Sequence, residues 1–99
     1  MTTKITHDTF KKELLSDPEV QAVYEELEEE FQLLDEMIRA RKKAGMTQAK
    51  IAKSMKTTTS VVSRLEAIPT RTKHSPSFAT LKKYAHAVGC KLSVKFVPQ

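Results

Sequence analysis

Residues 46–67, MTQAKIAKSMKTTTSVVSRLEA, decide the fold of this chain. Apolar side chains recur there at helical spacing in two short groups, and KTT at residues 56–58 interrupts the pattern. Thr47 and Thr58 each precede one group, where a threonine hydroxyl can cap the start of a helix. The stretch therefore predicts two short helices joined by a tight turn. The apolar groups are Ile51, Ala52 and Met55 in the first helix, and Val61, Val62 and Leu65 in the second.

A hairpin of two short helices has a shape that suits duplex DNA. The second helix fits the major groove while the first lies across the phosphates. Ala52 is small where the two helices would cross closely. Any helical hairpin can produce this pattern, so the spacing alone is a moderately specific indication of DNA binding. The exposed face of the second helix would carry Thr59, Ser60, Ser63 and Arg64.

Upstream of the hairpin, the sequence predicts a long helix. Asp17 stands at the N-cap and Pro18 at the first helical position, and no Gly or Pro follows until Gly45. We therefore expect one helix from Pro18 to Ala44, roughly 40 Å long at 1.5 Å per residue. A shorter helix is expected before it, at residues 9–15. The long helix carries a heptad-like apolar stripe formed by Val20, Tyr24, Leu27, Phe31, Leu34 and Ile38.

The N-terminal turns of the long helix are predicted to bind a partner. A body of about 60 residues is only about 25 Å across, so a helix of this length would extend beyond it. The alternative is that the whole stripe packs on the protein's own body. The expected partner-binding residues are Val20, Tyr24, Leu27 and Glu28.

Downstream, residues 67–76 form a polar, basic loop, and Ser77 can cap a further helix that ends at Gly89. One face of this helix would carry Phe78, Leu81, Tyr84, Ala85 and Val88. KLSVKFV at residues 91–97 then alternates apolar and polar side chains, which predicts a strand. Its apolar face is formed by Leu92, Val94 and Phe96.

The predicted strand needs a partner, because an isolated strand leaves its backbone groups unpaired. Helical hairpins that bind DNA usually read two half-sites, so a two-fold axis is expected. We therefore expect the strands of two copies to pair antiparallel across a dimer. Alternatives are that the strand extends the sheet of a partner protein, or that it pairs with TTKIT at residues 2–6.

Charge divides the chain of 99 residues and net charge +5 into two parts. Residues 1–36 contain 3 lysines and 11 acidic residues, a net charge of −8. Residues 37–99 contain 14 Lys and Arg and 1 acid, Glu66, a net charge of +13. A basic part suits a polyanion and an acidic part suits a basic protein. We therefore divide the chain into an acidic partner-binding arm, residues 1–30, and a DNA-binding and dimerisation domain, residues 31–99.

Several functional classes are disfavoured by composition. An enzyme needs converging acids, bases or a nucleophile, and the basic part has a single carboxylate and no glycine-rich loop. Cys90 and the three histidines lack metal-ligand spacing, so we expect neither a metal nor a cofactor. A coiled-coil scaffold would use the stripe but not the hairpin. No apolar run could span a membrane or direct secretion, so we expect a cytoplasmic protein without a membrane partner.

The hairpin sequence resembles the Cro/C1-type, or Xre-type, helix-turn-helix of phage repressors and bacterial regulators. Its residues follow the pattern T-Q-x-x-hydrophobic-A, then a turn, then S-R-hydrophobic-E. Lys56 stands where the family usually has glycine, and a positive φ there costs about 1 kcal/mol. SFATLKKYAHAVGCKLSVKF at residues 77–96 is similar to the continuation in HigA-type antitoxins. The resemblance implies a mainly α fold, in which a long N-terminal helix precedes the hairpin and one C-terminal β-strand pairs across a dimer.

In function, the resemblance implies an antitoxin that neutralises a co-encoded ribonuclease-type (RelE/HigB-like) toxin and represses its own operon. The alternative is a stand-alone Xre-type repressor without a toxin. The implied partners are double-stranded operator DNA, a basic protein toxin and a second copy of the chain.

The resemblance also assigns roles to single residues. Gln48 would bond a phosphate and brace the second helix, and Glu66 would pair with a nearby arginine. Arg64 would contact guanine through two hydrogen bonds, or else form a surface salt bridge or a phosphate contact. The expected DNA-binding residues are Gln48, Lys53, Lys56, Thr58, Thr59, Ser60, Ser63, Arg64, Arg71 and Lys73.

Overall fold

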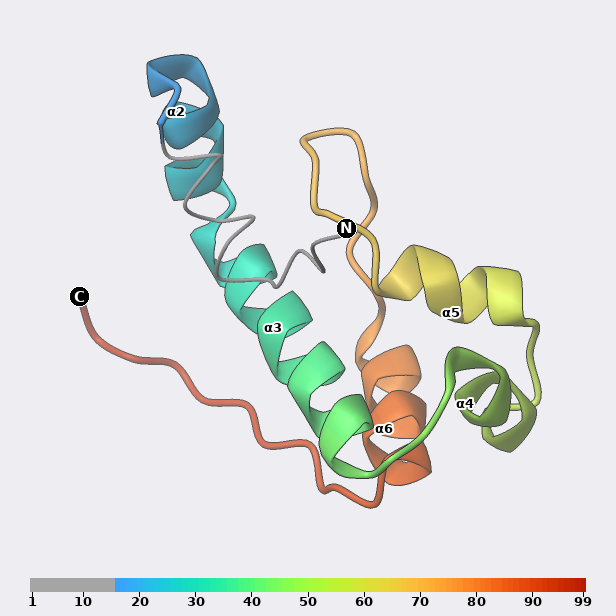
Figure 1. The fold of residues 1–99 in the computed structure, drawn as a ribbon. Coiled ribbons are helices and arrows are strands. Elements are labelled where there is room, and N and C mark those ends of the chain that lie inside the picture. Colours follow the sequence, from blue (N-terminus) through green and yellow to red (C-terminus); the bar gives the residue numbers. More distant parts are fainter. Residues whose placement is uncertain (1–15) are drawn as a thin grey trace.

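A computed structural model describes residues 16–99, which contain five α-helices and no strand. The helices are α2 (Pro18–Glu26), α3 (Glu28–Lys43), α4 (Gln48–Ser54), α5 (Thr59–Leu65) and α6 (Phe78–Ala87). Figure 1 shows α2 and α3 following one another along one side of the molecule, with the hairpin α4–α5 on the other side. The expected mainly helical fold is confirmed. The expected short helix at residues 9–15 lies outside the described residues.

The predicted helix boundaries at four N-termini are confirmed by side-chain caps. In each case a side-chain oxygen accepts a hydrogen bond from a backbone N–H two or three residues further on, which satisfies a donor that the helix itself leaves unpaired. The capping residues are Asp17, Thr47, Thr58 and Ser77. Gly45 and Gly89 follow helix ends with φ of 67° and 75°, the left-handed conformation that glycine adopts without a Cβ clash.

The prediction of one uninterrupted helix from Pro18 to Ala44 is wrong at Leu27. The backbone of Leu27 leaves helical geometry, with φ −106° and ψ 22°. Its N–H is shared between the carbonyls of Val23 and Tyr24, at 3.0 and 3.2 Å. The rings of Tyr24 and Phe31 pack across the interruption with centroids 4.6 Å apart. No Gly or Pro stands at this position, so the sequence does not indicate the interruption.

Two clusters of buried side chains hold the helices together. The main cluster joins α3, the hairpin and α6, and consists of Met37, Ile51, Ala52, Met55, Val62, Tyr84 and Val88. The second lies at the junction of α2 and α3 and consists of Tyr24, Leu27 and Phe31. The predicted stripe is buried from Tyr24 to Leu34, but the next buried residue is Met37 rather than Ile38. A straight helix turns every 3.6 residues, so a strict heptad stripe drifts off the buried face.

Helix α6 contributes the end of its predicted apolar face to the core. Tyr84, Ala85 and Val88 are buried and Leu81 is partly buried. Phe78, expected on the same face, is 60% exposed and does not join the core. It stands at the first turn of α6, and the Lys82 ammonium lies 5.9 Å from its ring centroid.

The C-terminal segment does not form the expected strand within one chain. Residues after Gly89 carry neither helix nor strand, and Figure 1 shows them as an extended tail that leads away from α6. A strand requires backbone hydrogen bonds to a neighbouring strand, and residues 16–99 contain none that could pair with the tail. The alternative partner, residues 2–6, lies outside the described part of the chain. Pairing across a dimer therefore stays a prediction.

The expected boundary between residues 30 and 31 falls within α3, so the acidic arm and the basic domain share one helix. Throughout residues 16–99, no helix has the length and apolar character needed to cross a membrane.

Candidate nucleic-acid interface

The hairpin α4–α5 is a rigid unit because its two helices bury their apolar faces against each other. Ile51 and Val62 are completely buried, and Ala52 is 3% exposed. The turn between the helices is closed by two backbone hydrogen bonds, from Thr57 N–H to the Ala52 carbonyl at 2.9 Å and from Lys56 N–H to the Lys53 carbonyl at 3.2 Å. This pair of bonds is a Schellman motif, which places its left-handed residue at Lys56.

Lys56 adopts φ 57°, so the positive φ predicted at this position is confirmed. A lysine Cβ is strained in this conformation, whereas glycine is not. Lys56 therefore adopts, at an energetic cost, a conformation that suits glycine, and it adds an exposed positive charge in the turn of the hairpin.

Lys56→Gly is expected to raise the free energy of unfolding by up to about 1 kcal/mol, because it removes the left-handed strain. The same substitution should weaken binding to any duplex DNA, because one positive charge near the phosphates is lost. Urea unfolding and a DNA titration measure the two effects. Lys56→Ala is the matched control, since it removes the charge but keeps the strain. A Lys56→Gly protein that is less stable than wild type would contradict the assignment of strain.

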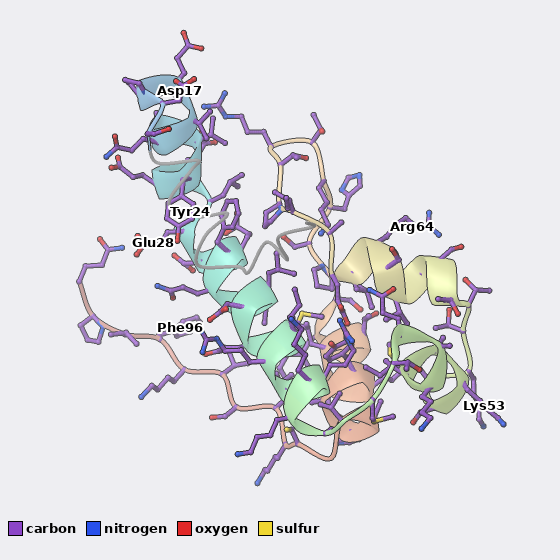
Figure 2. The ribbon with its side chains drawn as sticks, in the orientation of Figure 1. Asp17, Tyr24, Glu28, Lys53, Arg64 and Phe96 are labelled. Atoms are coloured by element: carbon purple, nitrogen blue, oxygen red, sulfur yellow. The ribbon has the colours of Figure 1, made fainter. Side chains whose placement is uncertain are left out.

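Polar side chains cover the outer surface of the hairpin. Among the predicted DNA-binding residues, those exposed on α4, α5 and the turn are Lys53, Lys56, Thr58, Thr59, Ser60, Ser63 and Arg64. In Figure 2 Arg64 projects from α5 and Lys53 from α4, both away from α3. Arg64 forms no ion pair with any residue in the described range 16–99. Its guanidinium is therefore free to meet a base or a phosphate.

Beneath this surface, a buried carboxylate ties α5 to three other helices. Glu66 follows α5 directly, and its side chain is only 3% exposed. Arg41 Nε of α3 donates to both of its carboxylate oxygens, at 3.0 and 2.9 Å. Gln48 Nε2 of α4 donates to Oε1 at 3.2 Å, and the Tyr84 hydroxyl of α6 donates to Oε2 at 2.7 Å. The predicted pairing of Glu66 with an arginine is confirmed, and the partner is Arg41.

The contacts of this network keep Tyr84 and Arg41 protonated. Burial, followed by the hydrogen bond to Glu66, raises the pKa of Tyr84, so the phenol keeps its proton. The hydrogen bond that Arg41 donates to Glu66 raises the pKa of Arg41 despite the opposing effect of burial. The Tyr84 oxygen also lies 3.0 Å from the Met37 carbonyl, but its single hydrogen favours the nearer, charged Glu66.

The part that Tyr84 plays in this network is what sequence reasoning missed. The sequence pattern places Tyr84 only on the apolar face of α6, whereas its hydroxyl completes the network around Glu66. Two features of the sequence point to such a role: Tyr84 carries the single polar atom on that face, and Glu66 is the single acid of the basic part. A buried carboxylate requires several donors, and tyrosine is a donor that an apolar face can carry.

Gln48 lies where a bracing residue is expected, since its bond to Glu66 connects the start of α4 with the end of α5. Its amide nitrogen carries two hydrogens, and only one is used by Glu66. The second hydrogen remains a donor for a phosphate, which is the other role expected of Gln48.

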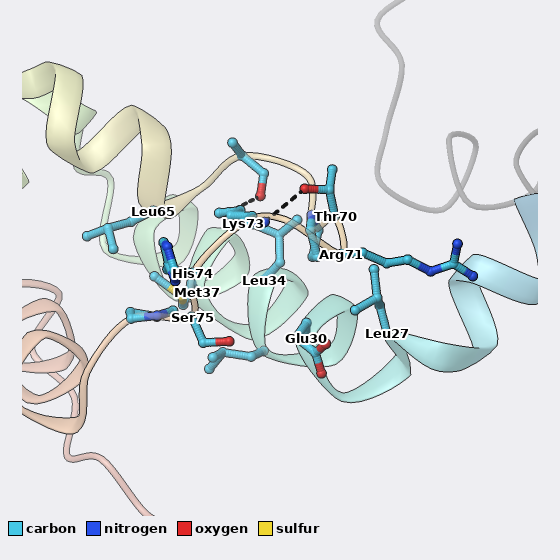
Figure 3. Close-up of a pocket in the computed structure, with 14 residues that line it drawn as sticks. Leu27, Glu30, Leu34, Met37, Leu65, Thr70, Arg71, Lys73, His74 and Ser75 are labelled. Carbon is cyan, nitrogen blue, oxygen red and sulfur yellow. Dashed lines mark hydrogen bonds between the residues drawn. The ribbon is translucent and has the colours of Figure 1, made fainter.

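Arg71 and Lys73 lie apart from the hairpin surface. Arg71 pairs with Glu26 of α2 at 2.8 Å, and Lys73 Nζ donates to the Ala67 carbonyl at 2.6 Å. Burial lowers the pKa of Lys73. Figure 3 shows that both residues line a cavity of about 240 Å³ between α3 and the loop at residues 67–76. The structure therefore does not bring them together with Lys53 and Arg64.

The expected partner-binding residues differ in exposure. Glu28 is exposed and Val20 is half-buried, while Tyr24 and Leu27 are each only 8% exposed. The apolar part of this surface is thus largely covered within the chain. The carboxylates beside it remain accessible, and the exposed ones at the junction of α2 and α3 are Glu25, Glu26, Glu28 and Glu29.

Comparison with known proteins agrees with the geometry of the hairpin. A family model described as helix-turn-helix matches residues 37–95, which is more than half of the chain. The matched region runs from the second half of α3 through the hairpin and α6 into the tail. No curated protein and no solved structure matches the chain.

Proposed function

The chain belongs to the helix-turn-helix family of the Xre, or Cro/C1, type, and from this premise we propose that it is a dimeric repressor and the antitoxin of a basic, ribonuclease-type toxin. Members of this family are sequence-specific DNA-binding regulators of transcription rather than enzymes. The observation that supports DNA recognition is the exposed outer face of α5, which carries hydroxyl groups and Arg64. Arg64 forms no ion pair within residues 16–99, and the bond between Arg41 and Glu66 connects the end of α5 to α3.

In the proposed complex, α5 enters the major groove and Arg64 forms two hydrogen bonds with a guanine. Thr59, Ser60 and Ser63 contact bases or backbone along the same face. Helix α4 lies across the phosphates, where Lys53, Lys56 and the second amide hydrogen of Gln48 are donors. The buried carboxylate of Glu66 fixes the angle between α5 and the rest of the body, which keeps these donors in register with the duplex.

The dimer in this proposal follows from how such hairpins read DNA. Two half-sites about one helical turn apart require two hairpins related by a two-fold axis. The C-terminal segment supplies a means of association, because Leu92, Val94 and Phe96 alternate with polar residues and have no strand partner among residues 16–99.

The antitoxin part of the proposal rests on the charge division of −8 and +13 between residues 1–36 and 37–99. Exposed carboxylates at the junction of α2 and α3 form a surface that attracts a basic protein. Since Tyr24 and Leu27 are buried, the carboxylates, including Glu28, provide the first contact with the toxin. The basic hairpin, at the other side of the molecule, stays available for the operator.

A stand-alone repressor is the second candidate, and one observation favours it. Glu26 of the acidic segment already pairs with Arg71 of the same chain. The acidic segment would then serve only to fold against the loop at residues 67–76. The two candidates share the DNA interface and differ only in whether a basic protein binds the carboxylates.

The triple variant Glu25→Lys, Glu28→Lys and Glu29→Lys separates the two candidates. These side chains are exposed, so helicity measured by circular dichroism should be retained. We expect the variant to lose co-purification with the product of the neighbouring gene and to lose protection of cells from it, because charge attraction becomes repulsion. The matched control is Glu25→Gln, Glu28→Gln and Glu29→Gln, which should weaken binding less. Wild-type chain that neither co-purifies with that product nor protects cells would support the stand-alone repressor.

A further inference from the structure

A second groove lies between α3, α6 and the start of the tail. Its volume is about 320 Å³. Its walls are mostly apolar and include Leu33, Met37, Ala40, Leu81, Ala85 and Val88. Glu36 of α3 is the acidic residue among its lining residues. No part of the proposed DNA or toxin surface uses this groove.

The tail that borders the groove carries exposed apolar side chains. Val94 is 64% exposed, Val97 is 70% exposed and Phe96 is fully exposed. Leu92 and Ser93 still line the groove, and the chain leaves it after them. In an extended segment Leu92, Val94 and Phe96 share one face, so the face that meets the groove at Leu92 continues beyond it, with Phe96 about 13 Å further on.

The tail cannot easily return to fill its own groove. Bringing Phe96 back beside Leu92 requires a reversal of the chain within three residues. Such a reversal normally uses Gly, Pro, Asn or Asp, and residues 90–97 contain none of these. The β-branched and aromatic residues of this segment favour an extended chain instead. The tail therefore does not fill the groove of its own chain, whereas the tail of a second copy can present the same exposed apolar side chains to it.

We propose that two copies of this chain exchange tails, so that Phe96 of each copy inserts into the groove between α3 and α6 of the other. Val94 lies between the two grooves, near the two-fold axis. Lys95, on the opposite face of the tail, stays in solvent. This inference rests on the dimer proposed above and adds the surface that holds it together.

Because the exchange is reciprocal, each substitution in the tail acts twice in the dimer. Phe96→Ser removes two buried aromatic side chains and should raise the dimer dissociation constant at least about 100-fold in sedimentation experiments. The substitution should leave the core unchanged, since Phe96 is fully exposed and belongs to neither buried cluster of residues 16–99. Lys95→Ala is the matched control in the same tail and should change the dissociation constant less than about threefold.

A mixture of two defective variants tests the exchange directly. Ala40→Phe fills the groove from α3 and should also weaken the homodimer, but its tail is intact. The Phe96→Ser chain has an intact groove and a defective tail. A heterodimer of the two regains one correct insertion, so it should form at least about 10-fold more tightly than either homodimer. Native mass spectrometry distinguishes the three dimers by mass. If Ala40→Phe does not fold, Glu36→Trp fills the groove from its exposed residue and replaces it.

Three results would overturn the exchange: a monomeric wild-type chain, a Phe96→Ser dimer as tight as wild type, or a mixture without enriched heterodimer. The proposed function is tested separately with a duplex that carries one half-site. Variants that lose the dimer should bind this half-site as wild type does, because the hairpin is unchanged. A wild-type dimer that exchanges tails but shows no sequence preference would contradict the proposed function alone.

Discussion

Glu66→Ala is expected to lower the free energy of unfolding by about 3–5 kcal/mol, the usual effect of removing one partner from a buried ion pair. The loss leaves Arg41, whose side chain is 18% exposed, without its carboxylate. It also leaves the Tyr84 hydroxyl and the Gln48 amide without their shared acceptor. Total stability of a small domain is only about 5–15 kcal/mol, so this is a large fraction of the whole.

Urea unfolding followed by circular dichroism measures this effect. Glu66→Gln keeps the shape and one acceptor oxygen but loses the charge, so it should be intermediate. Glu29→Ala is the control, because this carboxylate is exposed and its removal should change stability by less than about 0.5 kcal/mol. The double variant Arg41→Met with Glu66→Leu should recover part of the loss, since no unpaired charge remains buried. A Glu66→Ala protein as stable as Glu29→Ala would show that the network does not hold the helices together.

Arg64→Ala is expected to weaken binding to the operator by about 1–3 kcal/mol, or roughly 5- to 150-fold, and to relax base preference at one position. The physical reason is the loss of a planar guanidinium that matches the two acceptors of guanine. Binding to a scrambled duplex should fall much less. Arg64→Lys should behave like Arg64→Ala on the operator, because an ammonium keeps the charge but cannot form the paired hydrogen bonds.

The measurement is a titration of operator and scrambled duplex at several salt concentrations. Lys53→Ala is the comparison from the same hairpin. It should weaken both duplexes alike and lower the salt slope by about one unit, as expected for a phosphate contact. If Arg64→Ala weakens binding to both duplexes equally, Arg64 contacts a phosphate and its proposed contact with guanine is wrong.

Local features of this fold were predictable because they depend on residues that are close together in the sequence. Thr47, Thr58 and Ser77 cap the N–H groups three residues ahead of them. The spacing of apolar residues within each short helix determines which face is buried. Lys56 had to adopt a positive φ, because the hairpin turn requires a left-handed residue whatever side chain stands there.

Contacts between distant residues were decided only by the tertiary structure. The sequence indicated that Glu66 needs a donor, but only packing selected Arg41 and added Tyr84. Packing of Tyr24 against Phe31 accompanies a break at Leu27 that no Gly or Pro marks.

The same division applies to the candidate site and to the tail. Sequence alone identified Lys53 and Arg64 as exposed residues of the hairpin, since helical periodicity determines which side chains of each short helix face away from the core. It did not place Arg71, because loop conformation depends on what the loop meets, and here Arg71 meets Glu26 of α2. It also predicted the alternation of residues 91–97, but alternation determines only which side chains share a face. Whether that face is covered depends on a second strand or groove, and residues 16–99 of one chain leave Phe96 uncovered.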